Sequence, residues 1–184
     1  RTRMTCYKRE GGSIYWLGGI SLGVITRVKL VNWRSHEDTE LEFSKGTNVL
    51  VGSMGSGKSS VMDAICFALF GTFPALNAKK LSIDDCVMNT PEQKQSARVE
   101  LAVASNGKEY TILREVELGK GTKRSEIREN GSLLEGPQTK RVTEVIEQKL
   151  GVDYELFSRA VYSEQNQLDY FLQLRAGDRK KKID

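Results

Sequence analysis

The feature that most constrains this chain is a glycine-rich octapeptide between an apolar run and a helix-like segment. Its residues are, in order, Gly52, Ser53, Met54, Gly55, Ser56, Gly57, Lys58 and Ser59. They fit the pattern G-x-x-x-x-G-K-S/T, in which glycines let successive backbone N–H groups point at phosphate oxygens. The preceding run, Asn48–Val51, is apolar on both faces and predicts a buried central strand. We therefore predict a strand, a phosphate-binding loop and a helix.

The helix after the loop has apolar residues at helical spacing from Val61 until Gly71, where a glycine stop is followed by Pro74. Its positive end would face the same anion as the loop. Lys58 would reach the β- and γ-phosphates of a nucleotide, and the Ser59 hydroxyl would bind Mg²⁺. We therefore expect ATP and Mg²⁺ as ligands. The alternative is a plain Gly/Ser-rich turn. The absence of a guanine-reading N-K-x-D segment disfavours a GTPase.

The rest of the chain mixes strands and helices. Strand-like runs occupy 24–33, 39–43, 98–104, 108–116, 122–129 and 132–134. A polar turn at Arg34–Asp38 separates the first two. Asn106-Gly107 and Asn130-Gly131 favour tight hairpins, so this β region is predicted to be antiparallel. Helices are expected at 142–150, at 154–157 and from about residue 168. The simplest account is one α/β domain over residues 20–184, and residues 1–19 form an extension without an assigned role.

Composition excludes some classes of site. The three cysteines are not spaced as C-x-x-C, and His36 is the only histidine, so a zinc site or a disulfide framework is not expected. This cysteine usage suits a reducing, intracellular compartment. No apolar run is long enough to span a bilayer, so no membrane is expected as a partner. The net charge of +4 permits nucleic-acid binding without arguing for it.

Four motifs then occur in a recognisable order. Asn32–His36 (NWRSH) resembles N-F-R-S-H, and Gly52–Ser60 resembles G-x-N-G-S-G-K-S-S. Asp63–Gly71 resembles D-A-I…A-L-F-G, and Gln165–Asp169 (QNQLD) resembles the Q-loop Q-G-Q-I-D. Together, from about residue 24 to the end, the chain resembles the Rad50 branch of the SMC-like, ABC-type ATPases. Two departures matter: Met54 stands for the usual asparagine, and Asn166 for a glycine.

The resemblance implies an α/β fold, the amino-terminal lobe of an ABC-type P-loop NTPase with its antiparallel β region and Q-loop. It implies that Arg34 and Ser35 lie near the nucleotide, which the loop and Ser60 hold. It also implies that Gln165 contacts Mg²⁺ and the attacking water and acts in catalysis with Lys58. An amide carbonyl suits both roles because it binds a hard cation without adding charge.

Several parts of a complete ATPase site are missing. The sequence holds no apolar strand ending in Asp-Glu, no L-S-G-G signature and no later histidine. Leu81–Asp85 lacks a continuous apolar run and is interpreted as a loop or a helix start. In the family these parts lie in a carboxy-terminal half beyond a long coiled coil. The resemblance therefore implies ATP hydrolysis by the full protein and an inactive isolated fragment.

The family also implies partners. Two heads would sandwich two ATP molecules and act on DNA together with an Mre11-type nuclease. Basic residues that could contact DNA phosphates are Lys120, Lys123, Arg124, Arg128, Arg175 and Arg179–Lys182, although a solvated surface is the commoner role of such residues. The alternatives are an SMC or RecF/RecN-like chromosome-organising head and, from another class, a stand-alone small phosphotransferase.

Overall fold

The structure is a computed structural model, which describes residues 5–9 and 23–160. The chain divides into two compact units, Arg1–Val152 and Asp153–Asp184. In the second unit the described part is helix α4, Tyr154–Ala160. The predicted Q-loop and the helix expected from about residue 168 lie outside the described residues, as does the basic carboxy-terminal segment.

The first unit is built on an antiparallel sheet of six strands in the order β3-β2-β5-β6-β7-β8. The strands are β2 Val24–Trp33, β3 His36–Glu42, β5 Ser96–Ser105, β6 Lys108–Glu117, β7 Gly121–Glu129 and β8 Ser132–Glu135. The prediction of an antiparallel β region is confirmed. Both Asn-Gly pairs have positive φ at successive residues, 51° and 74° at Asn106-Gly107 and 48° and 84° at Asn130-Gly131.

The hairpin between β2 and β3 is tighter than predicted. The turn holds only Arg34 and Ser35, because Trp33 pairs with His36 across the two strands. The prediction of a turn over Arg34–Asp38 and a strand starting at residue 39 was therefore wrong by three residues. Arg34 adopts a φ of 49°, which closes the short turn. His36 is thereby moved from a loop onto the buried face of a strand.

A separate two-stranded sheet pairs β4, Thr47–Val51, with β1, Thr5–Arg9, in antiparallel register. The strand β4 forms where it was predicted, but the prediction that it is buried was wrong. Val49 and Val51 are 46% and 49% exposed. Asn48 and Leu50, on the other face of β4, are half-buried, so neither face of the strand belongs to a buried core. The strand β1 was not predicted.

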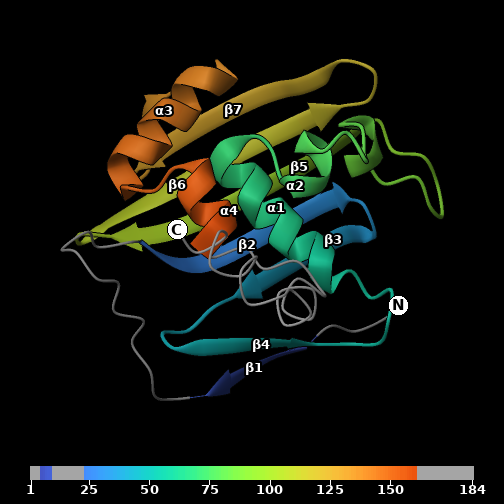
Figure 1. The fold of residues 1–184 in the computed structure, drawn as a ribbon, viewed down its shortest axis with the longest axis horizontal. Helices are drawn as coiled ribbons and strands as arrows, with labels where there is room; N and C mark the ends of the chain where they lie inside the picture. The colour runs from blue at the N-terminus through green and yellow to red at the C-terminus, as the bar shows by residue number, and fades with distance from the viewer. Residues whose placement is uncertain (1–4, 10–22, 161–184) are drawn as a thin grey trace, which may run out of the picture. The chain divides into compact units, whose positions relative to one another are not determined.

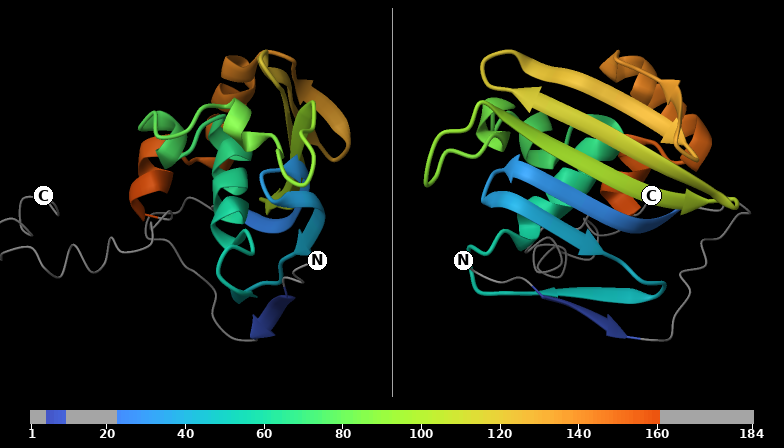
Figure 2. Two further views of the ribbon diagram at one scale, coloured as in Figure 1. Left: turned by 90° about the vertical axis from the view of Figure 1, so that its right-hand side faces the viewer. Right: turned by 180° about the vertical axis from the view of Figure 1, so that it is seen from behind.

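Helix α1, Lys58–Phe70, lies across one face of the six-stranded sheet against β2, β5 and β6 (Figure 1). Nine of its 13 residues are buried, so it is apolar on nearly every side. It ends at Gly71, whose φ of 71° allows its N–H to bond the Phe67 carbonyl. Helix α3, Thr139–Leu150, packs beside it on β7. The opposite face of the sheet carries no helix of the described part of this unit (Figure 2).

The remaining elements are short. Helix α2 is Pro74–Asn77, and a single 3₁₀ turn, η1, covers Asp84–Cys86. The prediction that Leu81–Asp85 is a loop or helix start is confirmed. Cys66 and Cys86 are buried, which raises the pKa of each thiol to about 12. No helix within the described ranges has the length and apolar character needed to cross a membrane.

Trp33 is the largest fully buried side chain and joins the sheet to α1. Its ring centroid lies 5.1 Å from that of Phe67, and its Nε1 donates to the Ser60 carbonyl at 3.0 Å. We predict that Trp33→Ala lowers the free energy of unfolding by about 3 to 5 kcal/mol, because it removes this packing and leaves a cavity. Chemical denaturation measures the loss. Leu133→Ala, at a side chain 55% exposed, is the control and should change little.

Candidate functional site

The glycine loop connects β4 to α1 at the foot of the helix. Gly55 and Gly57 adopt φ values of 80° and 88°, a left-handed conformation that favours glycine. Gly57 is the residue that caps the amino terminus of α1, and no side chain caps the helix there. The first turn of α1 also holds no acidic residue. The positive end of the helix is therefore left open to an anion.

The side chain of Lys58 folds back onto the glycine loop. Its Nζ donates to the carbonyls of Gly52 and Ser53, both at 2.8 Å, and to the Ser56 hydroxyl at 3.3 Å. The Ser56 N–H in turn donates to the Ser53 carbonyl at 3.2 Å. The ammonium group is thus held at the loop itself rather than in solution. Met54, which stands where asparagine is usual, is fully exposed at the loop's surface.

Ser35 and His36, at the hairpin between β2 and β3, pack against the Cα of Gly57. A Cβ atom at Gly57 would lie 2.5 Å from the Nε2 of His36 and 2.7 Å from the Oγ of Ser35. No side chain fits there without displacing one of them. The glycine is therefore required by its φ and also by the two side chains packed against it. This contact brings the predicted site residue Ser35 to the loop.

His36 holds the loop by a hydrogen bond. Its Nε2 lies 3.1 Å from the Gly57 carbonyl, and its Nδ1 lies 3.1 Å from the Thr39 hydroxyl. Since a carbonyl only accepts, Nε2 carries the proton and Nδ1 accepts from Thr39. Burial lowers the pKa of His36, which favours this neutral form. Sequence reasoning used His36 only as part of a motif and missed this role.

Arg34 and Trp33 extend the same contact along α1. Arg34 Nη1 donates to the Asp63 carboxylate at 2.5 Å, and its guanidinium lies 5.0 Å from the centre of the Phe73 ring. Together with the bond from Trp33 to Ser60, these contacts join the end of β2 and the turn after it to the first half of α1. The structure thus brings Arg34 to α1, where it pairs with Asp63, the first residue of the D-A-I segment, for which no partner was predicted.

A groove of about 360 Å³ runs beside the loop. It is lined by Ser35, His36, Asp38, Thr39, Glu40, Leu41, Gly55 and Ser56. Its volume falls within the range of small-ligand sites. The glycine loop lines one part of the groove, and β3 lines another.

The basic residues singled out in the β region are paired with carboxylates. Lys120 and Lys123 both contact Glu117. Arg124 and Arg128 flank Glu126, at 2.6 and 3.2 Å. Their charges are therefore partly balanced, and this arrangement does not by itself favour DNA.

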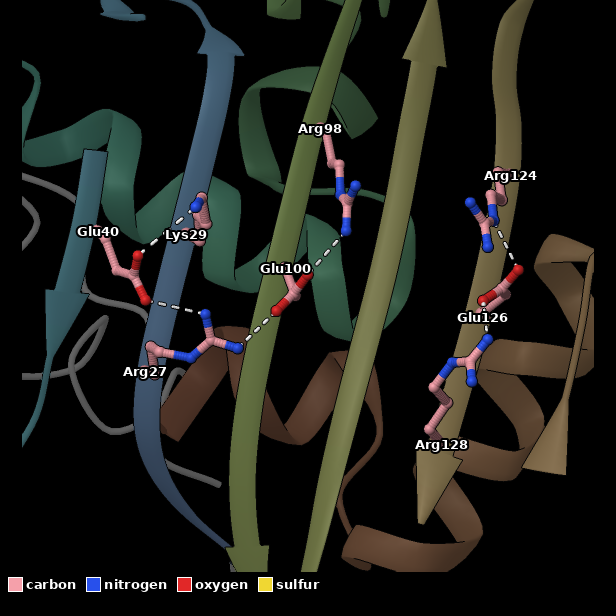
Figure 3. Close-up of polar contacts among 8 residues, drawn as sticks. All are labelled: Arg27, Lys29, Glu40, Arg98, Glu100, Arg124, Glu126 and Arg128. Carbon is pink, nitrogen blue, oxygen red and sulfur yellow. Dashed lines mark hydrogen bonds and ion pairs between the residues drawn. The ribbon is translucent and has the colours of Figure 1, made fainter. Parts of the chain in front are cut away.

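Arg124, Glu126 and Arg128 share the uncovered face of the sheet with a second set of ion pairs on β2, β3 and β5 (Figure 3). Arg27 bridges Glu40 at 3.0 Å and Glu100 at 2.5 Å, while Arg98 pairs with Glu100 at 2.9 Å. The pKa of Glu100 is held below its ordinary value by these arginines, against the effect of its own burial. Alternating charges on neighbouring strands thus keep this open face polar and mostly self-paired.

The expected metal ligands cannot all be placed. Ser59 lies in the first turn of α1 and is exposed. Gln165 lies outside the described residues. Within the ranges that the structure describes, no cluster of three or more His, Cys, Asp or Glu residues could hold a metal ion.

Comparison with known proteins agrees with this geometry. Residues 27–184 match the AAA domain family. The DNA double-strand break repair Rad50 ATPase of Methanocaldococcus jannaschii is 30% identical over 156 residues, which is 85% of this chain and 14% of that protein. The same-named ATPase of Methanopyrus kandleri is 34% identical over 168 residues, 88% of this chain and 18% of that protein. The chain thus spans less than a fifth of these relatives.

Solved structures share the fold. A chain from work on ATP-driven dimerization and DNA stimulated activation of SMC ATPases has a TM-score of 0.64 at 24% identity, over 87% of this chain and 97% of that one. The recombination mediator RecF with ATP has a TM-score of 0.51 at 21% identity, over 66% of this chain and 31% of that one. The chain belongs to the AAA domain family and corresponds to an amino-terminal fragment of a Rad50-type ABC ATPase.

Proposed function

We propose that this chain binds ATP through the loop Gly52–Ser59 as part of a DNA-repair ATPase head. The observation that carries the proposal is the open amino terminus of α1 beneath a loop with left-handed glycines at Gly55 and Gly57. Backbone N–H groups at a helix terminus are a ready anion site. The Rad50 relatives, which are ATPases by name, support the nucleotide as the anion.

The chain's residues fit such a ligand. The ammonium group of Lys58 already lies at the loop. On nucleotide binding, phosphate oxygens would replace the carbonyls of Gly52 and Ser53 as its hydrogen-bond acceptors. Ser59 and Ser60 follow at the start of α1, where the Ser59 hydroxyl would hold Mg²⁺. The magnesium ion would neutralise charge on the phosphates and align them.

The groove beside the loop suits the rest of the nucleotide. Ser35 lines it, and its Oγ lies close to Gly57, so this hydroxyl is placed to contact the ligand. Arg34 makes its ion pair with Asp63 through Nη1, while its buried Nη2 has no hydrogen-bond partner. We propose that this second nitrogen serves the nucleotide. A buried donor without an acceptor is costly and favours such a contact.

Hydrolysis is proposed for the full protein, with Gln165 orienting water and Mg²⁺. The acidic strand end and the signature segment are missing from this sequence, so the chain alone would hold nucleotide without efficient turnover. A carboxy-terminal half of the same head would supply them. Two such heads would then close on two ATP molecules, with ATP stabilising the closed state.

The biological setting proposed is double-strand break repair inside the cell, on DNA and with an Mre11-type nuclease. The names of the relatives support repair over the alternative of an SMC or RecF/RecN-like chromosome-organising head. A stand-alone phosphotransferase, the third reading, would turn over substrate without a second half.

Substitution of Lys58 tests the role of the loop in the ATPase activity. In the chain co-expressed with the carboxy-terminal half, Lys58→Ala should lower the ATPase rate by about a hundredfold or more, because one pre-positioned charge at the phosphates is lost. ATP-dependent dimerisation, followed by light scattering, should fall in parallel. Lys140→Ala, an exposed lysine on α3, is the matched control and should leave both unchanged.

The ATPase rate of the isolated chain provides the comparison. Turnover by the 184-residue chain alone, at the rate of the two halves together, would contradict the proposed division of the site. An unaffected rate in Lys58→Ala would contradict the role of the loop.

A second prediction concerns Gly57. Gly57→Ala should weaken Mg-ATP binding, measured by calorimetry, because the new methyl group would displace His36 and Ser35 and distort the loop. The unfavourable φ adds a cost of about 1 to 3 kcal/mol. Gly107→Ala is the control: it has a φ of 74° but open space around its Cβ, and it lies in a distant hairpin. It should carry the backbone cost and leave Mg-ATP affinity unchanged; equal affinity loss in both variants would refute the packing argument.

A further inference from the structure

Arg114, on β6, is fully buried beneath helix α1. The alternation of β6 puts it on the same face as Tyr110, Ile112 and Val116, all of which are buried core residues. Arginine is rarely found in such a position unless its nitrogens are satisfied. No carboxylate in the described part of the chain forms an ion pair with it.

Its guanidinium makes four hydrogen bonds. Nε donates to the Ala68 carbonyl at 2.8 Å, and Nη2 donates to the Leu69 carbonyl at 3.1 Å. Nη2 also donates to the Thr143 hydroxyl at 2.8 Å, and Nη1 to the Ser125 hydroxyl at 3.2 Å. One side chain of β6 thus bonds to α1, to β7 and to α3.

The two hydroxyl acceptors, Ser125 and Thr143, are themselves hydrogen-bonded to Thr139. Ser125 and Thr139 lie 3.1 Å apart through their hydroxyl oxygens, and Thr143 donates to the Thr139 carbonyl at 3.0 Å. A Cβ at Gly71 would lie 3.2 Å from Arg114 Nη1 and 3.3 Å from the Thr139 methyl group. Little room is left for the guanidinium to move.

The position matches the electrostatics of a helix end. Carbonyls in the last turn of α1 lack partners within the helix, and this end carries the negative pole of the helix dipole. Arg114 supplies donors and a positive charge there. Burial lowers its pKa to about 10, so the side chain remains charged at neutral pH.

The opposite end of the same helix is the phosphate loop. With 13 residues, α1 places its two ends about 20 Å apart. Contacts from Trp33, Arg34 and His36 fix the amino-terminal end. Arg114 fixes the carboxy-terminal end against the sheet and α3. A tilt of a rigid helix at one end displaces the other.

We propose that Arg114 is a positioning residue for nucleotide binding, which fixes the carboxy-terminal end of α1 to β7 and α3 and so sets the orientation of the phosphate loop. This inference rests on the proposed function of the loop. Arg114 does not contact the nucleotide; it acts through α1.

The test compares Arg114→Met, Arg114→Lys and Thr143→Val in the full-length protein that carries this chain. We expect Arg114→Met to weaken Mg-ATP binding by about tenfold, a typical size for a coupling through intervening residues. Amide hydrogen exchange at residues 61–64, the first amides of α1 that bond within the helix, should speed up in the absence of nucleotide. Arg114→Lys keeps the positive charge but not the planar guanidinium. Its Mg-ATP affinity should therefore lie between those of Arg114→Met and the wild type. If the Met variant does not fold, the Lys and Thr143→Val variants carry the test.

Ile127→Ala is the matched control, because Ile127 is fully buried on β7 but makes no polar contact with Arg114. It should lower stability without changing Mg-ATP affinity or amide exchange at residues 61–64. Arg114 variants that lose stability but retain the affinity and exchange of this control would overturn the inference. A wild-type protein that does not bind Mg-ATP would instead overturn the proposed function. The exchange measurement would still decide whether Arg114 orients the loop.

Discussion

The position of the phosphate loop depends on how helix α1 is held against the sheet. The helix is buried on nearly every side, and its two ends are fixed by different means. At the amino terminus Trp33, Arg34 and His36 reach Ser60, Asp63 and Gly57 in turn. At the carboxy terminus Arg114 bonds two helix carbonyls. The loop is therefore oriented by polar contacts that converge on one apolar helix.

The two faces of the sheet differ in their surroundings. One face packs on α1 and α3 and supplies the core. The other is open in the described residues and is covered by alternating arginine and glutamate side chains, such as Arg27 between Glu40 and Glu100. Exposed ion pairs of this kind contribute little to stability, but they keep a broad sheet face polar and disfavour nonspecific association. The positive charges there are mostly matched, which is why net charge is a weak guide to DNA binding in this chain.

Much of the fold could be predicted from local patterns. The Asn-Gly hairpins follow from the φ angles those residues tolerate, and α1 follows from its apolar spacing and its glycine stop. The start of β3 could not be predicted from propensity, since His36 belongs to the strand only because Trp33 pairs with it. The burial of Arg114 could have been predicted from the sequence, because the alternation of β6 places this residue among apolar ones.

The local sequence was sufficient to predict the conformation of the glycine loop and to suggest a phosphate ligand, because glycines, a lysine and a serine at fixed spacing constrain the backbone whatever surrounds it. The tertiary structure alone decided which residues support that loop. The contacts of Gly57 with His36, and of Ala68 with Arg114, join segments far apart in the chain. They depend on how strands pair and on where a helix lies across them. Such contacts have no local pattern, since their energy arises only when distant segments pack together.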